Sequence, residues 1–85
     1  MKIVFSNSFE KDYKKLPTKV QKLLGKQLIM LLENSKYPSL RIKKMQGHGS
    51  IWEGRVTKNY RFTFEKINDT YVIRRAGTHP ILKNP

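Results

Sequence analysis

Two histidines and five arginines are the side chains in this sequence best suited to chemistry. His48 stands in a loop flanked by glycines, and His79 follows the last apolar segment. The arginines all lie in the second half of the chain: Arg41, Arg55, Arg61, Arg74 and Arg75. Imidazole exchanges protons near neutral pH, and the planar guanidinium group binds phosphate oxygens in pairs. The combination favours chemistry on a phosphodiester.

These residue types match cleavage of RNA without a metal ion. A base removes the proton of the ribose 2′-hydroxyl group, an acid protonates the leaving 5′-oxygen, and cations stabilise the phosphorane. A histidine beside arginines fits that requirement. It equally fits an ordinary surface or capping histidine, so residue types alone leave both interpretations open.

Other kinds of site find no support. Two histidines without carboxylates at ligand spacing make a poor metal site. The sequence has no cysteine, no glycine-rich phosphate loop before a helix, and no supported serine triad. We therefore predict neither a metal nor a small-molecule cofactor.

The net charge of +12 points to a polyanionic partner. Nucleic acid, an acidic protein and an anionic membrane surface all fit, and so does a merely well-solvated surface. Every basic residue in the range 1–36 is lysine, the usual charge of a helix surface. The arginines, which suit phosphate better, are all in the range 37–85.

Eighty-five residues predict one domain, 1–85. No apolar run approaches the length of a membrane-spanning helix, and the first residues do not resemble a signal peptide. We expect a soluble, cytoplasmic protein that does not associate with membranes.

Hydrophobic spacing predicts an α+β fold. Residues 1–5 form a strand, and residues 8–33 form two helices broken at Pro17, the first with a capping-box-like start at Asn7. Alternation and β-branched or aromatic residues predict strands at 40–45, 51–56, 60–64 and 70–76. The expected order is an N-terminal strand, a two-helix hairpin, and a three- to four-stranded antiparallel sheet.

The register of the central hairpin follows from which residues must share a face. Trp52 and Val56 lie on one face of their strand, as Tyr60 and Phe62 do on the next. Both sets reach the same side only across an odd loop, 57–59, in which Asn59 would adopt the left-handed conformation. Arg55 then lies opposite Arg61 on the other face.

A second predicted turn, Asn68-Asp69, places Arg74 opposite Thr63 on that same face, and a paired 40–45 strand adds Arg41 and Lys43. Burying several arginines without carboxylates is too costly, so the face is expected to be open and the helices to cover the other one. An ordinary solvated sheet face is the alternative. The residues expected in the core are Trp52, Val56, Phe62, Phe64, Leu24, Leu28 and Leu31.

Several segments, in this order and spacing, resemble the RelE/ParE superfamily of toxins across essentially the whole chain. The matching segments are 9–17, Pro38-Ser39-Leu40 leading to 43–47, 51–56, 59–64 and Arg75-Ala76-Gly77-Thr78-His79. The last of these is similar to the glycine–any–histidine ending of the YafQ and YoeB branches. Pro80 to Pro85 lacks the aspartate or aromatic residue that many members carry after this histidine.

The resemblance implies the toxin of a type II toxin–antitoxin pair, with a cognate antitoxin that wraps it. In the ribosome-dependent branches the activity is endoribonuclease cleavage of mRNA in the ribosomal A site. By position, His79 matches the C-terminal histidine and would be general acid or base. Arg55 matches a basic catalytic residue, Arg61 matches the tyrosine–arginine strand, and both would stabilise the phosphorane.

The remaining predicted site residues would bind RNA: Arg41, Lys43, Lys44, Asn59 and Arg74. Lys43 and Asn59 stand where the YafQ branch carries a histidine and an aspartate. Membership of the superfamily leaves two other functions open. One is inhibition of DNA gyrase, as in the ParE branch, and the other is an inactive relic that binds nucleic acid or antitoxin.

Overall fold

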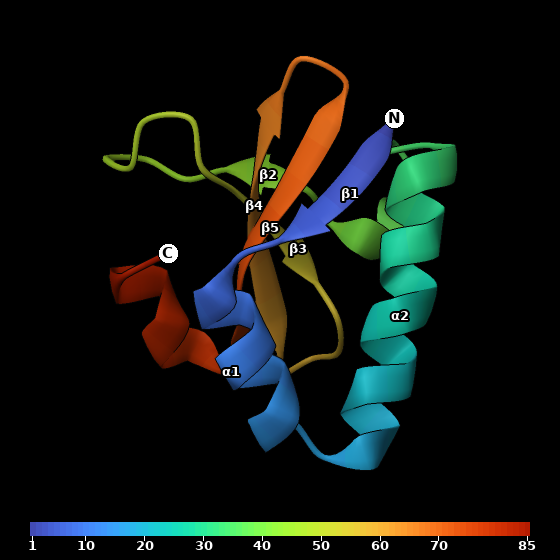
Figure 1. The fold of residues 1–85 in the computed structure, drawn as a ribbon, viewed down its shortest axis with the longest axis vertical. Helices are drawn as coiled ribbons and strands as arrows, with labels where there is room; N and C mark the ends of the chain where they lie inside the picture. Colours follow the sequence, from blue (N-terminus) through green and yellow to red (C-terminus); the bar gives the residue numbers. More distant parts are fainter.

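The computed structural model describes residues 1–85, which form one sheet with two helices against it (Figure 1). The chain begins with β1 (Lys2–Phe5), α1 (Asn7–Lys15) and α2 (Thr18–Glu33). The remaining strands are β2 (Lys43–Lys44), β3 (Trp52–Arg55), β4 (Arg61–Ile67) and β5 (Thr70–Gly77). Two short 3₁₀ helices, η1 (Pro38–Leu40) and η2 (His79–Lys83), precede β2 and follow β5. The predicted α+β order is confirmed.

The sheet has five strands in the order β1-β5-β4-β3-β2. β2 to β5 are joined in antiparallel pairs, as predicted. β1 adds a fifth strand, parallel to β5, which spacing along the sequence did not place. A parallel pair needs a long connection between its strands, and here the helices and the other three strands lie between them.

At a helix start the first backbone amide hydrogens have no acceptor within the helix, and both helices here begin at a residue suited to that position. Ser6 caps α1, because its Oγ accepts a hydrogen bond from Phe9 N at 3.0 Å and donates one to Arg74 O at 2.8 Å. The expected start at Asn7 was wrong by one residue, since Asn7 is already helical. Pro17 precedes α2 and has no amide hydrogen to leave unsatisfied there.

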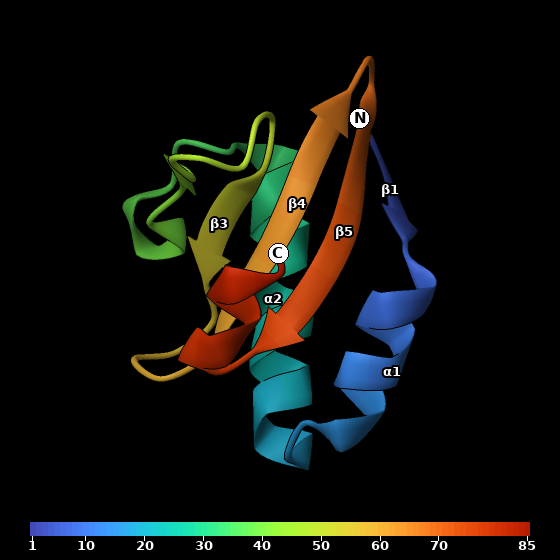
Figure 2. The same cartoon turned by 90° about the vertical axis from the view of Figure 1, so that its left-hand side faces the viewer.

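The core lies between α2 and the inner face of the sheet. Leu24, Leu31, Phe62 and Ile73 are completely or almost completely buried in it. The predicted burial of Phe62, Phe64, Leu24, Leu28 and Leu31 is confirmed, whereas Trp52 and Val56 only pack against the edge of the core. In Figure 2, α2 lies behind the sheet, and the opposite face of the sheet points toward the viewer.

The β3–β4 hairpin has the predicted register. Arg55 pairs with Arg61, and Val56 N donates to Tyr60 O at 3.0 Å. The expected left-handed conformation of Asn59 was wrong. The Thr57 hydroxyl group shapes the turn instead by accepting hydrogen bonds from the backbone amides of Asn59 and Tyr60, at 3.3 and 3.2 Å.

The β4–β5 hairpin departs from the prediction at a bulge. Its turn lies at Asn68, which has φ 54°, as expected of Asn68-Asp69. The register shifts between Thr63 and Phe64, so that Thr63 pairs with Arg75 rather than with Arg74. A bulge inserts one residue and redirects the side chains around it.

Residues 40–45 form much less strand than predicted. Leu40 ends η1, Arg41 has a left-handed backbone with φ 47°, and only Lys43 and Lys44 pair with β3. Because Leu40 is completely buried, it holds η1 to the core and delays the strand.

The C-terminal segment crosses the face opposite α2. Figure 2 shows η2 in front of the sheet. The Thr63 hydroxyl group and Arg74 Nε both donate to Pro85 O, each at 3.1 Å. No helix of the chain is both long and apolar enough to cross a membrane.

Candidate functional site

A cleft of about 340 Å³ opens on the sheet face that points away from α2. Its lining is almost entirely charged: Arg41, Ile42, Lys43, Glu53, Arg55 and Arg61. The sequence placed four of these side chains on one basic face, and the structure brings those four together. A small cleft with three arginines and one lysine is suited to an anion.

Strand pairing determines which side chains lie together in the cleft. The antiparallel pairs Arg55–Arg61 and Lys43–Glu53 put these side chains on one face of three neighbouring strands. Arg41 enters from the chain before β2, where its left-handed backbone turns the chain toward the sheet edge. The cleft therefore combines short-range turn geometry with the long-range register of the sheet.

Arg61 and Arg55 are held in different ways. Arg61 Nη1 donates to the carbonyl oxygens of Thr57 and Lys58, at 3.0 and 2.9 Å, so the β3–β4 loop fixes this guanidinium group. Arg55 makes no side-chain hydrogen bond, and its Nε is buried without a partner. An unsatisfied buried donor costs about 1–3 kcal/mol. The Arg55 guanidinium group thus has donors that a ligand in the cleft could satisfy.

The electrostatics of the cleft also favour an anion. Partial burial lowers the pKa of Arg55, the charges of Arg61 and Arg41 lower it further, and Glu53 opposes the shift. All three guanidinium groups stay charged at neutral pH, because arginine titrates far above it. Their mutual repulsion is relieved when a negatively charged group enters.

Sequence reasoning did not identify two side chains of this region as part of the site. Glu53 is 5% exposed and pairs with Lys43 Nζ at 3.0 Å. Gln27, also buried, donates from Nε2 to Arg55 O at 2.8 Å and to Ser39 O at 3.2 Å. Gln27 gave a signal, since it lies three residues after Leu24 on the apolar side of α2. Its position ties the helix to the backbone of the cleft.

Four predicted site residues lie outside the cleft. His79 is exposed at the start of η2, two residues after Gly77, which pairs with Arg61. Lys44 and Asn59 are exposed. Lys44 pairs with Trp52 and lies on the opposite face of β2 from Lys43, and Asn59 is in the β3–β4 loop. Arg74 lies on the same open face but its Nη1 pairs with Glu65 Oε1 at 2.6 Å.

The bulge residues anchor the helices and the tail to β5. Arg75 Nε donates to Asp12 Oδ2 at 2.7 Å and its Nη1 to Asn84 O at 3.0 Å. The hydrogen bond to Asp12 raises the pKa of Arg75, against the effect of burial. Asp12 also accepts from Ala76 N at 3.1 Å. These contacts are structural, and they place His79 near the end of β5.

The cleft can bind and polarise a phosphate group. Guanidinium donors and a lysine provide the positive charge that stabilises a reacting phosphate group. No three His, Asp or Glu side chains gather in the protein as a metal site would need. The chemistry that these side chains themselves support is phosphoryl chemistry on a polyanion.

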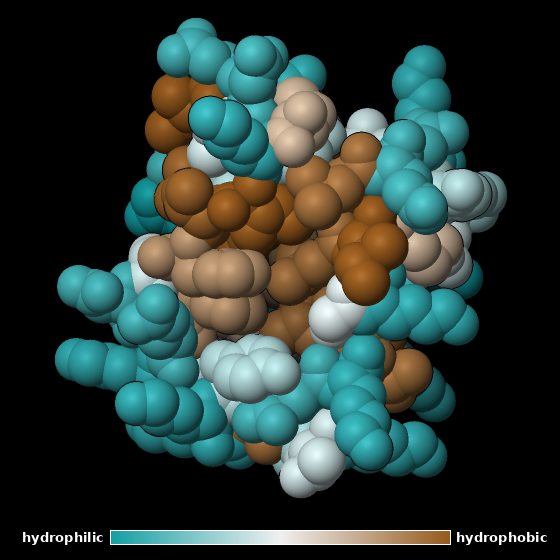
Figure 3. All heavy atoms as spheres, turned by 45° about the vertical axis from the view of Figure 1, so that its right-hand side comes forward, coloured by the Kyte–Doolittle hydropathy of each residue, from teal (hydrophilic) through white to brown (hydrophobic).

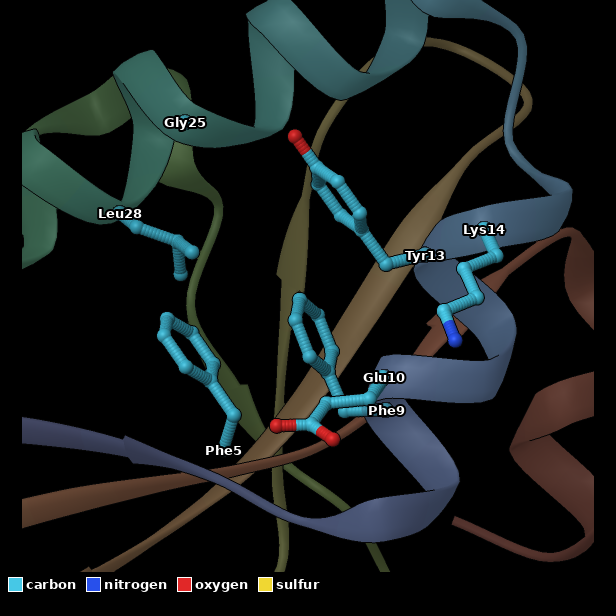
Figure 4. A pocket seen from close by; sticks show the side chains of 7 residues that line it. All are labelled: Phe5, Phe9, Glu10, Tyr13, Lys14, Gly25 and Leu28. Atoms are coloured by element: carbon cyan, nitrogen blue, oxygen red, sulfur yellow. The ribbon is translucent and has the colours of Figure 1, made fainter.

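A second hollow, of about 400 Å³, is apolar and lies between β1, α1 and α2. Figure 3 shows an apolar patch with charged side chains around it. Figure 4 shows the rings of Phe5, Phe9 and Tyr13 in the hollow, with Leu28 reaching in from α2. Phe5 is 47% exposed and stacks on Phe9 with ring centroids 5.0 Å apart. Exposed apolar patches of this kind are typical of protein contacts.

The chain is similar in sequence to a known toxin. "Toxin RelE3" of Methanocaldococcus jannaschii is 36% identical over 79 residues, covering 89% of this chain and 88% of that protein. No protein-family model matches the sequence.

Solved structures share the fold. YafQ from Escherichia coli superposes with a TM-score of 0.80 at 18% identity, over 94% of each chain. A chain of the RelB–RelE antitoxin–toxin complex from Methanococcus jannaschii superposes with a TM-score of 0.72 at 25% identity, over 95% of each chain. The E. coli DinJ–YafQ toxin–antitoxin complex gives a TM-score of 0.79 at 19% identity, over 94% of this chain and 93% of that one.

Proposed function

Because the chain belongs to the RelE family of toxins, we propose that it is the toxin of a type II toxin–antitoxin system and cleaves mRNA in the ribosomal A site. The observation that carries the proposal is the cleft on the open sheet face. It gathers Arg41, Lys43, Arg55 and Arg61 around a space large enough for a phosphodiester group. RelE and YafQ toxins are mRNA-cleaving endoribonucleases, and this cleft has the charge that such a reaction needs.

The proposed roles follow from the position of each side chain. Arg55, with its unpartnered Nε, and Arg61, held by the loop, stabilise the negative charge of the phosphorane. His79, at the start of η2 and two residues after Gly77, which pairs with Arg61, transfers a proton in the reaction. The arginines provide the positive charge at the phosphate, so the reaction needs no metal ion there.

The other proposed RNA contacts surround the cleft. Lys43 and Arg41 hold the RNA backbone inside it, and exposed Lys44 and Asn59 extend the contact along β2 and beyond the β3–β4 loop. Arg74 binds RNA at the far side of the open face once Glu65 releases it. Contacts of this kind add affinity with a strong dependence on salt.

The proposed partner is a cognate antitoxin with acidic and apolar segments. The net charge of +12 favours an acidic partner, and the apolar hollow between α1 and α2 supports a protein contact. Structural neighbours of this chain include toxin–antitoxin complexes. Co-expression with the cognate antitoxin is expected to restore growth that the toxin alone inhibits.

The test of the activity compares variants on translated message. Primer extension with purified ribosomes measures cleavage by the wild-type protein and by His79→Ala and Arg55→Ala. Each substitution is expected to lower the rate about 10²–10⁴-fold, since each removes a group that acts on the reacting phosphate. Folding and antitoxin binding are expected to change little because both side chains lie outside the core.

The matched control is Lys22→Ala, which removes an exposed charge from α2 on the far side of the sheet. It is expected to cleave at the wild-type rate. Wild-type protein that leaves message intact on the ribosome but blocks DNA gyrase would refute the proposed activity and indicate a ParE-like function. Cleavage by His79→Ala at the wild-type rate would assign the reaction to the side chains of the cleft alone.

A further inference from the structure

Glu53 is the one acidic side chain in the lining of the cleft. The other charged side chains in the lining are three guanidinium groups and an ammonium group, which are already protonated, and Ile42 is apolar. Glu53 is 5% exposed, so a carboxylate has been buried in the middle of a cationic site. Burial of a carboxylate is costly unless both of its oxygens have partners, and only Oε1 has one here, so a specific role is expected.

The hydrogen bonding of the cleft is incomplete in a way that matches a ribonucleotide. Glu53 Oε2 is a buried acceptor without a donor, and Arg55 Nε is a buried donor without an acceptor. The two residues are two positions apart on β3 and share one face. A ribose with its 3′-phosphate supplies both missing partners, because the 2′-hydroxyl group donates and the phosphate oxygen accepts.

Lys43, on the neighbouring strand β2, forms an ion pair with the Glu53 carboxylate. Its Nζ lies 3.0 Å from Glu53 Oε1, yet 73% of its side chain is exposed. β2 is a two-residue strand at the sheet edge, so few contacts hold Lys43 in place. An RNA phosphate is a second anion with which the Lys43 ammonium group can pair. When Lys43 moves to that phosphate, the Glu53 carboxylate is free to contact the nucleotide.

We propose, on the basis of the proposed function, that Glu53 accepts the proton of the attacking 2′-hydroxyl group after Lys43 has moved to the RNA phosphate. The 2′-oxygen forms a bond to phosphorus while its proton passes to Glu53 Oε2. The bond from phosphorus to the 5′-oxygen breaks, and His79 protonates that oxygen. The products are a 2′,3′-cyclic phosphate and a 5′-hydroxyl end, with no oxidant or cofactor consumed.

The test uses Glu53→Gln, which keeps the shape of the side chain but cannot take up the proton. Single-turnover cleavage of message on programmed ribosomes is expected to fall about 10²–10⁴-fold. Glu53→Asp keeps a carboxylate and is expected to recover part of the rate. Glu33→Gln, which removes an exposed carboxylate at the end of α2 away from the cleft, is the control and is expected to stay within about threefold of the wild-type rate.

A binding measurement separates the chemical role from a structural one. Fluorescence anisotropy compares a 12-nucleotide RNA with the same sequence in 2′-deoxy form. The wild-type protein is expected to prefer RNA about tenfold, and Glu53→Ala, which has no side-chain acceptor for the 2′-hydroxyl group, is expected to bind both strands equally. Binding of the deoxy strand by Glu53→Gln is expected to be at least as tight as by the wild-type protein, because a negative charge has left the phosphate site.

The outcomes distinguish this proposal from the proposed function. Wild-type cleavage that Glu53→Gln retains within threefold, or loses in proportion to binding, would refute the role of Glu53 alone. Wild-type protein that does not cleave would refute the nuclease activity. If that protein still preferred RNA in a way that depends on Glu53, the contact between Glu53 and the 2′-hydroxyl group would be supported without the reaction. Absence of both cleavage and RNA preference would refute both.

Discussion

Replacement of Gly54 by alanine is expected to destabilise the core beneath the cleft. Gly54 pairs with Phe62 across β3 and β4, and a Cβ atom there would lie 2.4 Å from Phe62 Cζ and 2.6 Å from Cε1. The Phe62 ring is completely buried, so it has no open space into which to move. Overpacking of this kind costs about 1–3 kcal/mol. For a domain of this size the midpoint of thermal unfolding should fall by about 4–24 °C.

Thermal unfolding followed by circular dichroism measures the change, and Gly25→Ala is the matched control. Gly25 lies inside α2, where an added Cβ meets no atom within 4 Å. Alanine is a better helix former than glycine by about 0.5–1 kcal/mol, so this variant should be more stable than the wild-type protein. The same chemical change is thus expected to have opposite signs at the two positions.

A double-mutant cycle identifies the cause. Phe62→Leu removes the ring atoms that an added Cβ would contact, at the cost of a cavity in the wild-type core. In the Gly54→Ala background it is expected to cost at least about 1 kcal/mol less than it costs alone. Additive effects, or a Gly54→Ala variant as stable as Gly25→Ala, would refute the packing argument.

Three further substitutions test contacts that hold the fold around the cleft. Ser6→Ala removes the cap of α1 and is expected to cost about 1 kcal/mol of unfolding free energy, measured by urea denaturation. Asp12→Asn weakens the partly buried pair with Arg75, and a loss of about 1.5–3 kcal/mol is expected in the same assay. Gln27→Leu leaves the carbonyl of Arg55 without its donor. It should cost about 1–3 kcal/mol and slow message cleavage, measured by primer extension.

Lys22→Ala, on the exposed side of α2, is the control for all three and is expected to stay within about 0.5 kcal/mol of the wild-type protein. A Ser6→Ala protein as stable as this control would contradict the assigned cap. The same result for Asp12→Asn or Gln27→Leu would show that solvent replaces the lost contact.

The sequence by itself determined the parts of the site that depend on local periodicity. Side chains alternate along a strand, and the parity of a hairpin loop decides which faces coincide. Trp52 and Phe62 had to share the buried side, so Arg55 had to lie opposite Arg61 on the open side, as the structure confirms. The apolar spacing of 8–33 likewise determined two helices, because one face of each must be buried.

Hydrophobic alternation and residue propensity did not predict backbone conformations that depend on a particular side-chain contact. The Thr57 hydroxyl group completes the β3–β4 turn, and Asn59 therefore keeps an ordinary backbone. Buried Leu40 holds η1 to the core, which shortens the predicted 40–45 strand to two residues. In both cases a contact made in the folded chain outweighed an intrinsic preference.

Only the tertiary structure decided the features of the site that depend on contacts between residues far apart in the chain. The bulge in β5 accompanies contacts of Arg74 O with Ser6 and of Arg75 with Asp12, across separations of 68 and 63 residues. The burial of Glu53 likewise requires β2, β3 and β4 to be assembled, since an isolated strand would leave its carboxylate in water. Sequence spacing gives the face on which a side chain lies, but burial and partners arise only when distant segments have excluded water from it.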